Sequence, residues 1–424
     1  MSAPLLMFVI VFAPHDPPPP QYLTPIPILN ADLSSDRNLF LTEHPQVATP
    51  WVLTSLAESD RASIRTRPLP DRGAPTVEAT IEVARERELR DERFLAIEPG
   101  ATAIMLLETD DALLPVEPGA RYECSWAEGT TEGNQSPRLE LSLRSATTQQ
   151  PLGSAAISPR DPHGLWKRSR AHLQVDSRGR TAEEGMLLCL HNPKDADSPL
   201  FIDNLTLARI QEDPPEFQVL FNGRDLTGWA GSEGTLEDAF VVRDGVIECN
   251  PNAQHGNNLL TEEAFADFIL HLEFKLPPAG NNGIALRSPL VGDPAYEGFE
   301  AQVLDTINPV YMNIKPWQTH GSIYGVAPSK RGFQRPTGDW NQQSIHVEGR
   351  QVVVVLNGET ILDVDLDAAV EHGTLSGQDH PGLLRTEGHV GFCGHGDPVS
   401  FRNIRIQPLE TPTQPSPEPD RTRQ

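Results

Sequence analysis

The sequence predicts an all-β protein made of two β-sandwich (jelly-roll) domains in tandem, and three observations support this fold class. Short apolar runs that alternate with polar residues recur along the chain, as in half-buried strands. The 32 glycines and 40 prolines fall between these runs, where tight turns are expected. At 424 residues the chain is too long for one ordinary domain, so two domains are expected.

The first 19 residues are expected to form an apolar leader followed by a Pro-rich spacer. Residues 4–13 are an apolar run of signal-peptide length, which favours export to the periplasm or the medium. No Lys or Arg precedes this run, and Pro14 follows it at once, so an apolar tail without a signal function is the alternative. Residues 410–424 are polar and Pro-rich and are expected to form a disordered tail.

The N-terminal domain is expected to span residues 20–212. In RLELSLRS, the leucines at 139, 141 and 143 share one face of a predicted strand. The charged segment 84–93 fits either an exposed helix or an extended stretch. An N-x-D-x turn (30–33), a V-x-P-G-x-x-Y strand (116–122) and an aromatic-IDN-x-x-L strand (201–207) follow one another in this order. This order resembles galactose-binding-like carbohydrate-binding modules, which implies a β-sandwich and leaves ligand binding open.

The C-terminal domain is expected to span residues 213–409, after the acidic, Pro-containing linker 211–217. In FILHLEFKL (268–276) the apolar residues alternate with His271, Glu273 and Lys275, which we expect to face outward. Asp244-Gly245 and Asn357-Gly358 mark hairpin turns, since Asn-Gly supplies the positive φ angles that a type I′ turn needs. Consecutive hairpins with one apolar face predict an antiparallel sandwich.

The strand GFEAQVLDT (298–306) carries the most informative polar residues. Glu300 and Gln302 share one face, opposite Phe299, Ala301 and Val303. A carboxylate beside an amide provides the acceptors and donors that sugar hydroxyls require. A solvated strand face is the plainer interpretation of the same pattern. Asp305 is expected at the rim of the site.

Other candidate site residues each have a structural alternative. Arg287 in NNGIALRS is either a cation facing the same groove as Glu300 or a surface ion-pair partner. Asn282 lies in a turn that could contact a ligand. His395 stands between two glycines and could approach a ligand or a metal, or lie in solvent. Tyr324 and Trp340 are either aromatic contacts for a sugar or core residues.

The C-terminal half resembles the 3-keto-disaccharide hydrolase domain family, long known only as a domain of unknown function. The matching segments appear in family order: LFNGRDLTGW (220–229), FVVRDGVIE (240–248), LLTEEAFADFILHLEFKL (259–276), NNGIALRS (281–288), GFEAQVLD (298–305), GSIYG (321–325), GDWNQQSIHVEG (338–349) and GHGDPVSFRNIRI (394–406). The resemblance implies a concanavalin-like jelly roll and cleavage of 3-keto-glycosides. In that reaction the C3 ketone acidifies the C2 hydrogen, a base removes it, the C1 substituent leaves by elimination, and water adds to the enone.

Roles follow from what this chemistry requires. Glu300 is our choice for the base, with Asp305 second, and His395 is the candidate acid. Arg287 would stabilise the enolate, or a divalent ion held by Glu300, Asp305 and His395 would do so. The substrate-binding residues are expected to be Gln302, Asn282, Tyr324 and Trp340. Replacing Glu300 by Gln is expected to abolish most activity and to leave the melting temperature nearly unchanged.

The charge restricts the partners. A formal net charge of −25 disfavours nucleic acid and anionic membrane surfaces, so a neutral sugar or glycoside is the expected substrate, bound by a monomer. A retaining β-glucanase on the same fold is a rival, but such enzymes carry E-x-D-x-x-E, and Gln302 and Asp305 depart from that pattern. A tandem lectin without catalytic groups is the non-enzymatic alternative.

Four cysteines fall two to each predicted domain. In an oxidising compartment Cys124 is expected to pair with Cys189, and Cys249 with Cys393. Four buried free thiols are the alternative. The chain has no C-x-x-C spacing, which argues against a zinc site built on cysteine.

Overall fold

The computed structural model describes 21–26, 52–53, 61–65, 78–83, 93–97, 102–109, 112–113, 116–129, 139–157 except 147 and 149, 166–176, 185–193, 200–212, and 214–409 except 233–238, 254–256 and 312. The apolar run at 4–13, the turn at 30–33, the charged residues 84–92 and the tail 410–424 lie outside these ranges. Within them, no helix is both long enough and apolar enough to cross a bilayer.

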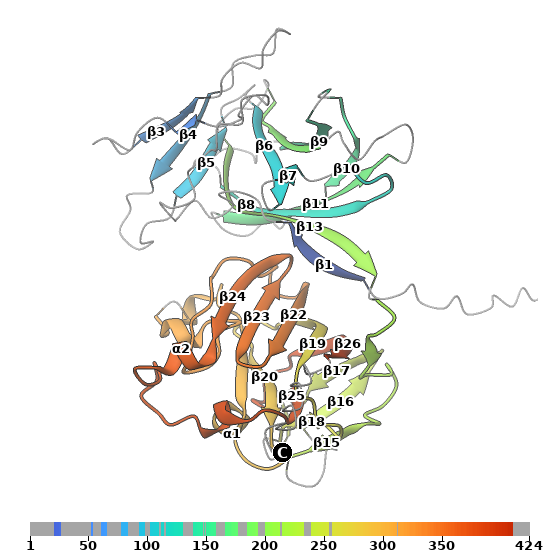
Figure 1. Ribbon diagram of the computed structural model, residues 1–424, viewed down its shortest axis with the longest axis vertical. Coiled ribbons are helices and arrows are strands. Elements are labelled where there is room, and N and C mark those ends of the chain that lie inside the picture. Colours follow the sequence, from blue (N-terminus) through green and yellow to red (C-terminus); the bar gives the residue numbers. More distant parts are fainter. Residues whose placement is uncertain are drawn as a thin grey trace, which may run out of the picture.

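The described N-terminal half contains two antiparallel sheets (Figure 1). The larger sheet has the order β10 (Gly153–Ile157), β11 (Trp166–Val175), β8 (Arg121–Gly129), β13 (Leu200–Glu212), β5 (Arg93–Ile97), β4 (Glu78–Val83), β3 (Arg61–Arg65) and β2 (Val52–Leu53), with β1 (Gln21–Ile26) also paired to β13. The smaller sheet has the order β7 (Ala112–Leu113), β6 (Thr102–Thr109), β12 (Met186–His191) and β9 (Glu140–Ser145).

One apolar core joins these two sheets. Leu141 and Leu143 of β9 are buried in it with Trp126 of β8, while Glu140 is exposed. The alternation predicted from RLELSLRS is therefore confirmed. The segment 201–207 lies within β13, as predicted, whereas the predicted strand at 116–122 is mostly a turn at Pro118 and Gly119 that leads into β8.

The C-terminal half is a second sandwich. Its eight-stranded sheet has the order β16 (Phe240–Arg243), β17 (Val246–Cys249), β26 (Ser400–Pro408), β19 (Phe268–Lys275), β22 (Trp340–Glu348), β23 (Gln351–Leu356) and β24 (Glu359–Asp365), with β14 (Gln218–Val219) paired to β26. Its five-stranded sheet has the order β15 (Trp229–Gly231), β18 (Leu259–Thr261), β25 (His389–Phe392), β20 (Asn281–Ser288) and β21 (Phe299–Leu304). The helices are α1 (Pro294–Glu297), α2 (Leu366–Val370), η3 (Pro309–Tyr311), η4 (Pro316–Gln318) and η5 (Pro381–Leu384).

Alternation along β19 builds the core between these sheets. The side chains of Phe268, Leu270, Leu272, Phe274 and Leu276 are buried there, as predicted. His271 and Glu273 face away from this core, but they are 6% and 9% exposed rather than open to solvent. Phe217 stacks on the His271 ring with centroids 4.4 Å apart, and Leu23 of the N-terminal half lines the same small cavity as His271 and Glu273. The outward orientation predicted for these two side chains is therefore confirmed, but other parts of the chain cover this face and shield them from solvent.

The predicted hairpin turns form. Asn357 and Gly358 have φ values of 50° and 86°, and Asp244 and Gly245 have 50° and 76°. The Asn-Gly turn joins β23 to β24, and the Asp-Gly turn joins β16 to β17.

All four cysteines are buried free thiols. The conditional pairing of Cys124 with Cys189 and of Cys249 with Cys393 is therefore not present, and the alternative of free thiols holds. Burial raises the pKa of the Cys189 thiol to about 11, which keeps it protonated and unreactive.

Candidate functional site

A cavity of about 510 Å³ opens on the five-stranded sheet of the C-terminal half, on the side away from the sandwich core. Strand β21 contributes Glu300, Gln302 and Leu304, and β20 contributes Asn281. The wall is completed by α1 and its cap, by Tyr311, Ile314 and Gln318, and by the loop that follows β25. In Figure 1, α1 lies at the end of this half that is remote from the N-terminal half.

Strand periodicity places Glu300 and Gln302 in this cavity. Phe299, Ala301 and Val303 fill the core on the other face, so the two polar side chains point together toward the lining, as predicted. Glu300 is only 4% exposed. Burial raises the pKa of its carboxyl above the usual value, although His395 opposes the rise. Its Oε1 has no hydrogen-bond partner among the described residues, which leaves a lone pair free to accept a proton.

His395 lies beside this carboxylate. Its Nε2 is 3.9 Å from Oε1 of Glu300, which is an ion-pair distance rather than a hydrogen bond. The interaction with Glu300 raises the pKa of His395, although burial opposes this rise. The imidazole is 42% exposed on its other side, so a ligand in the cavity can reach it. The arrangement supplies a base that is poorly solvated and an acid whose pKa is raised by the neighbouring carboxylate.

Amide and phenol groups complete the polar lining. Gln302 donates from Nε2 to Asn281 Oδ1 at 2.7 Å, and the Asn281 N–H donates to Asp397 Oδ2 at 2.9 Å. The first bond fixes the orientation of both side-chain amides, and the second anchors the Asn281 backbone. Tyr324 packs edge-on against Trp317 with ring centroids 5.1 Å apart. Burial raises the pKa of Tyr296, with Tyr324 as the next cause, so the Tyr296 hydroxyl stays a donor.

Arg287 does not line this cavity. Its side chain is 2% exposed and donates to Asp267 at 2.7 Å and to the carbonyl oxygens of Ala266 and Gly349, both at 2.8 Å. These contacts tie β20 to neighbouring loops and use the donors that an enolate would need. Of its two predicted roles, the structure places Arg287 in the ion pair, buried rather than at the surface.

Asp305 is also held apart from Glu300 and His395. Its Oδ2 accepts a hydrogen bond from the Ala279 N–H at 2.8 Å, so the carboxylate caps a turn beyond the end of β21. The predicted ligand set of Glu300, Asp305 and His395 therefore does not converge. Across the described ranges, no group of three His, Cys, Asp or Glu side chains is arranged to hold a metal ion.

Two predicted substrate contacts lie elsewhere. Asn282 is fully buried and accepts a hydrogen bond from the Gly283 N–H at 2.9 Å, outside the cavity lining. Trp340 begins β22 and lies under the guanidinium of Arg402, 4.0 Å from the ring centroid, also outside the lining. Tyr324 and Gln302 are the predicted contacts that do line the cavity.

Several lining residues were not predicted from the sequence. The cavity also contains Asn258, Asp293, Tyr296 and Tyr311. Only one signal was available for this group. Asp293-Pro294 has the pattern of a helix N-cap followed by Pro, and Asp293 does accept from the Ala295 N–H at 3.0 Å. The cap brings Tyr296 to the cavity wall.

Comparison with known proteins agrees with the C-terminal motifs. Residues 216–407 match the family model described as a 3-keto-alpha-glucoside-1,2-lyase-like domain. A 3-keto-disaccharide hydrolase from Bacteroides thetaiotaomicron is 27% identical over 237 residues, which cover 47% of this chain and 80% of the relative.

Two solved structures are similar to part of this chain. A protein from Parabacteroides distasonis assigned as a glycosyl hydrolase is 26% identical and covers 46% of this chain and 94% of its own, with a TM-score of 0.41. The carbohydrate-binding module CBM66 from Bacillus subtilis is 14% identical and covers 42% and 95%, with a TM-score of 0.29. The galactose-binding-like resemblance of the N-terminal half stays a prediction. The resemblance predicted for the C-terminal half is confirmed, since residues 216–407 match the 3-keto-alpha-glucoside-1,2-lyase-like domain family.

Proposed function

We propose that the C-terminal half cleaves 3-keto-glycosides in the cavity around Glu300 and His395. The observation that carries the proposal is the pairing of a 4% exposed carboxylate, one oxygen of which lacks a partner in the described residues, with an imidazole 3.9 Å away. The match of residues 216–407 to the lyase-like family supports the choice of substrate.

Glu300 takes the proton from C2 of the 3-keto sugar, and the electron pair of the C2–H bond moves into the enolate of the C3 ketone. The enolate then re-forms the ketone and expels the C1 substituent, whose oxygen receives a proton from His395. Water adds to C1 of the resulting enone and a proton returns to C2, so one water is consumed for each bond cleaved. Burial of Glu300 favours removal of the C2 proton, because a poorly solvated carboxylate is a stronger base.

Neutral hydrogen-bond donors stabilise the enolate. No Lys or Arg is among the residues that line the cavity in the described ranges. The hydroxyls of Tyr296 and Tyr324 are two such donors, and we assign them to an oxyanion on C3. They replace Arg287 in the role first expected for it.

The decisive test is the release of aglycone from a 3-keto-glycoside and from its unoxidised parent, followed with the purified full chain. Turnover of the keto substrate alone supports the proposal. Equal cleavage of both would favour the β-glucanase alternative, in which no ketone is needed. Binding of both sugars by calorimetry, without cleavage of either, would favour the lectin alternative.

A further inference from the structure

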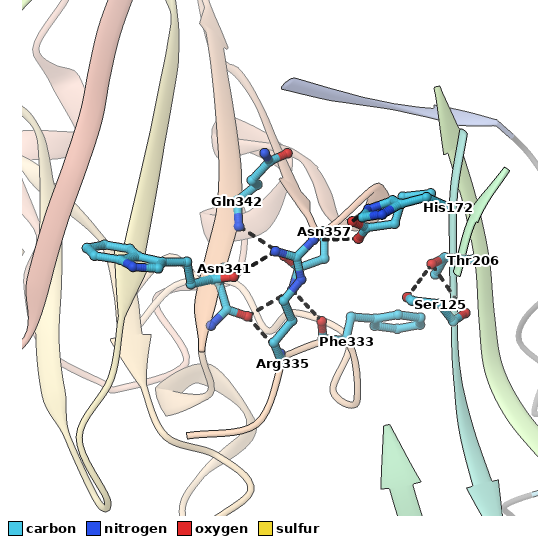
Figure 2. Close-up of polar contacts among 10 residues, drawn as sticks. Ser125, His172, Thr206, Phe333, Arg335, Asn341, Gln342 and Asn357 are labelled. Carbon is cyan, nitrogen blue, oxygen red and sulfur yellow. Dashed lines mark hydrogen bonds and ion pairs between the residues drawn. The ribbon is translucent and has the colours of Figure 1, made fainter. Parts of the chain in front are cut away.

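The outer face of the N-terminal sheet is covered by the C-terminal half. Along β8, Tyr122, Cys124 and Trp126 point into the N-terminal core, so Glu123 and Ser125 point out of it. These two are only 6% and 7% exposed. Figure 2 shows the side chain of Phe333, from the C-terminal half, pointing toward Ser125 and Thr206 on this face.

A buried ion pair fixes the two halves together. The Glu123 carboxylate pairs with the Arg335 guanidinium, and the two side chains are 7% and 13% exposed. His172 of β11 approaches the same carboxylate, with Nε2 3.1 Å from Oε2. Arg335 also donates to the Trp340 carbonyl at 2.7 Å. Because both charges are buried, each depends on the other for compensation.

Close backbone packing surrounds this pair. A Cβ built on Gly358 would lie 2.3 Å from the Cβ of Ala208 on β13, so the turn of the β23–β24 hairpin touches the N-terminal sheet. Asn357 in this turn donates from Nδ2 to the Phe333 carbonyl and to Asn341 Oδ1, both at 2.8 Å (Figure 2). The turn and the loop 333–337 are therefore held as one contact surface.

The same loop holds the end of the strand that carries Glu300. Gln334, next to Arg335, donates from Nε2 to the Leu304 carbonyl at 2.7 Å. Its Oε1 accepts from the Thr306 N–H at 3.2 Å. Leu304 ends β21 and lines the cavity. One short loop thus contacts the N-terminal sheet through Arg335 and the cavity strand through Gln334.

We propose that the N-terminal half positions the active cavity through this loop. Glu123 holds Arg335, the fixed loop places Gln334, and Gln334 sets the position of the end of β21. Glu123 and Gln334 are positioning residues, since neither lines the cavity. The expected effect on activity rests on the proposed function, whereas the expected effect on hydrogen exchange does not.

Hydrogen exchange of the full chain tests the coupling without any substrate. In Glu123→Gln, the peptides covering 304–306 and 333–337 should exchange roughly fivefold faster, while β23 in the core is unchanged. Glu117→Gln is the matched control, since Glu117 pairs with Arg209 inside the N-terminal half. It should leave exchange at 304–306 unaltered. Faster exchange at 333–337 without a change at 304–306 would overturn the proposal.

Gln334→Met removes only the hydrogen bonds from Gln334 to Leu304 and Thr306. This variant tests the proposal even if Glu123→Gln destabilises the whole chain. We expect unchanged exchange in β8, faster exchange at 304–306, and a kcat/KM lower by roughly tenfold. The acid limb of the kcat/KM profile should also move, whereas loss of folded protein would only lower the profile. Unchanged exchange at 304–306 in this variant overturns the coupling, even if the chain proves inactive on 3-keto-glycosides. Faster exchange at 304–306 with an unchanged pH profile of kcat/KM overturns the positioning role.

Discussion

The carboxylate of Glu300 occupies the space that a side chain at Gly283 would need. These residues lie on the paired strands β20 and β21, where Gly283 is opposite Gln302. A Cβ built on Gly283 would lie 1.8 Å from Glu300 Oε1 and 2.4 Å from its Cδ. Gly283 is therefore required for space, and it lets the carboxylate lie flat against the sheet beneath the cavity.

Gly283→Ala should displace the Glu300 carboxylate and lower kcat on a 3-keto-glycoside by roughly a hundredfold, the scale of a 1 Å misplacement. The fold should persist, because a side chain rather than backbone has to move. Steady-state kinetics and circular dichroism measure both effects. Adding Glu300→Asp shortens the acid by one methylene and should recover part of the activity. Full activity of Gly283→Ala alone would show that this packing does not matter.

Glu300→Gln should lower turnover by roughly a hundredfold or more and raise stability at neutral pH. Because burial raises the pKa of Glu300, folding disfavours its ionised form, and this cost is absent below the usual value of 4.5. The melting temperature of the variant should exceed that of the wild type at pH 7 and match it near pH 4. The expectation of an unchanged melting temperature assumed an open groove, whereas Glu300 is 4% exposed. A lower melting temperature at pH 7 would show that the carboxylate stabilises the fold.

The pH profile of kcat/KM should be bell-shaped. Activity should rise as Glu300 loses its proton, at a pKa above 4.5, and fall as His395 loses its own, at a pKa above 6.5. His395→Gln should abolish the alkaline limb. It should also move the acid limb to higher pH, because His395 holds the Glu300 pKa down. An alkaline limb that survives this substitution would assign the acid to another group.

Arg287→Met should destabilise the protein by about 3 kcal/mol, the lower end of the cost of breaking a buried ion pair. Asp267 would remain 11% exposed and without its guanidinium partner. Activity per folded molecule should be unchanged, since Arg287 lies outside the cavity lining. Arg243→Met, which removes a 69% exposed partner of Glu248, should leave stability nearly unaltered. Chemical denaturation and active-site-normalised kinetics separate the two effects.

Strand periodicity was enough to predict the centre of the site. The alternation in β21 sends Glu300 and Gln302 to one face, whatever the rest of the fold does. The same reasoning failed for Arg287, because the pairing of β20 with β25 shifts register between Ala285 and Ser288. Arg287 itself has a φ of 46° there. Such a bulge changes the direction of a side chain, and no pattern in NNGIALRS predicts the bulge.

Loop residues of the site depend on tertiary contacts that the sequence does not display. The wall around Tyr296 is held by His380, whose Nδ1 lies 3.0 Å from the Ala295 carbonyl oxygen, 85 positions away in the chain. The covering of His271 and Glu273 likewise depends on how the two halves meet. Alternation assigns a face to these residues, but it says nothing about what lies over that face.

The cavity should discriminate against anionic sugars. Asp293 and Glu300 both line it, and no Lys or Arg does so in the described ranges. A substrate carboxylate about 4 Å from Asp293 would be repelled by roughly 1–4 kcal/mol, so kcat/KM for a 3-keto-glucuronide should fall at least fivefold below that for a 3-keto-glucoside.

Asp293→Asn should remove much of that difference, because it deletes the charge and keeps the cap. Asparagine is as good an N-cap as aspartate, so the bond from the Ala295 N–H should survive and α1 should stay in place. The ratio of the two kcat/KM values, measured at low and high salt, tests the idea, since screening weakens a charge effect. A ratio that Asp293→Asn leaves unaltered would mean that shape, rather than charge, rejects the uronate.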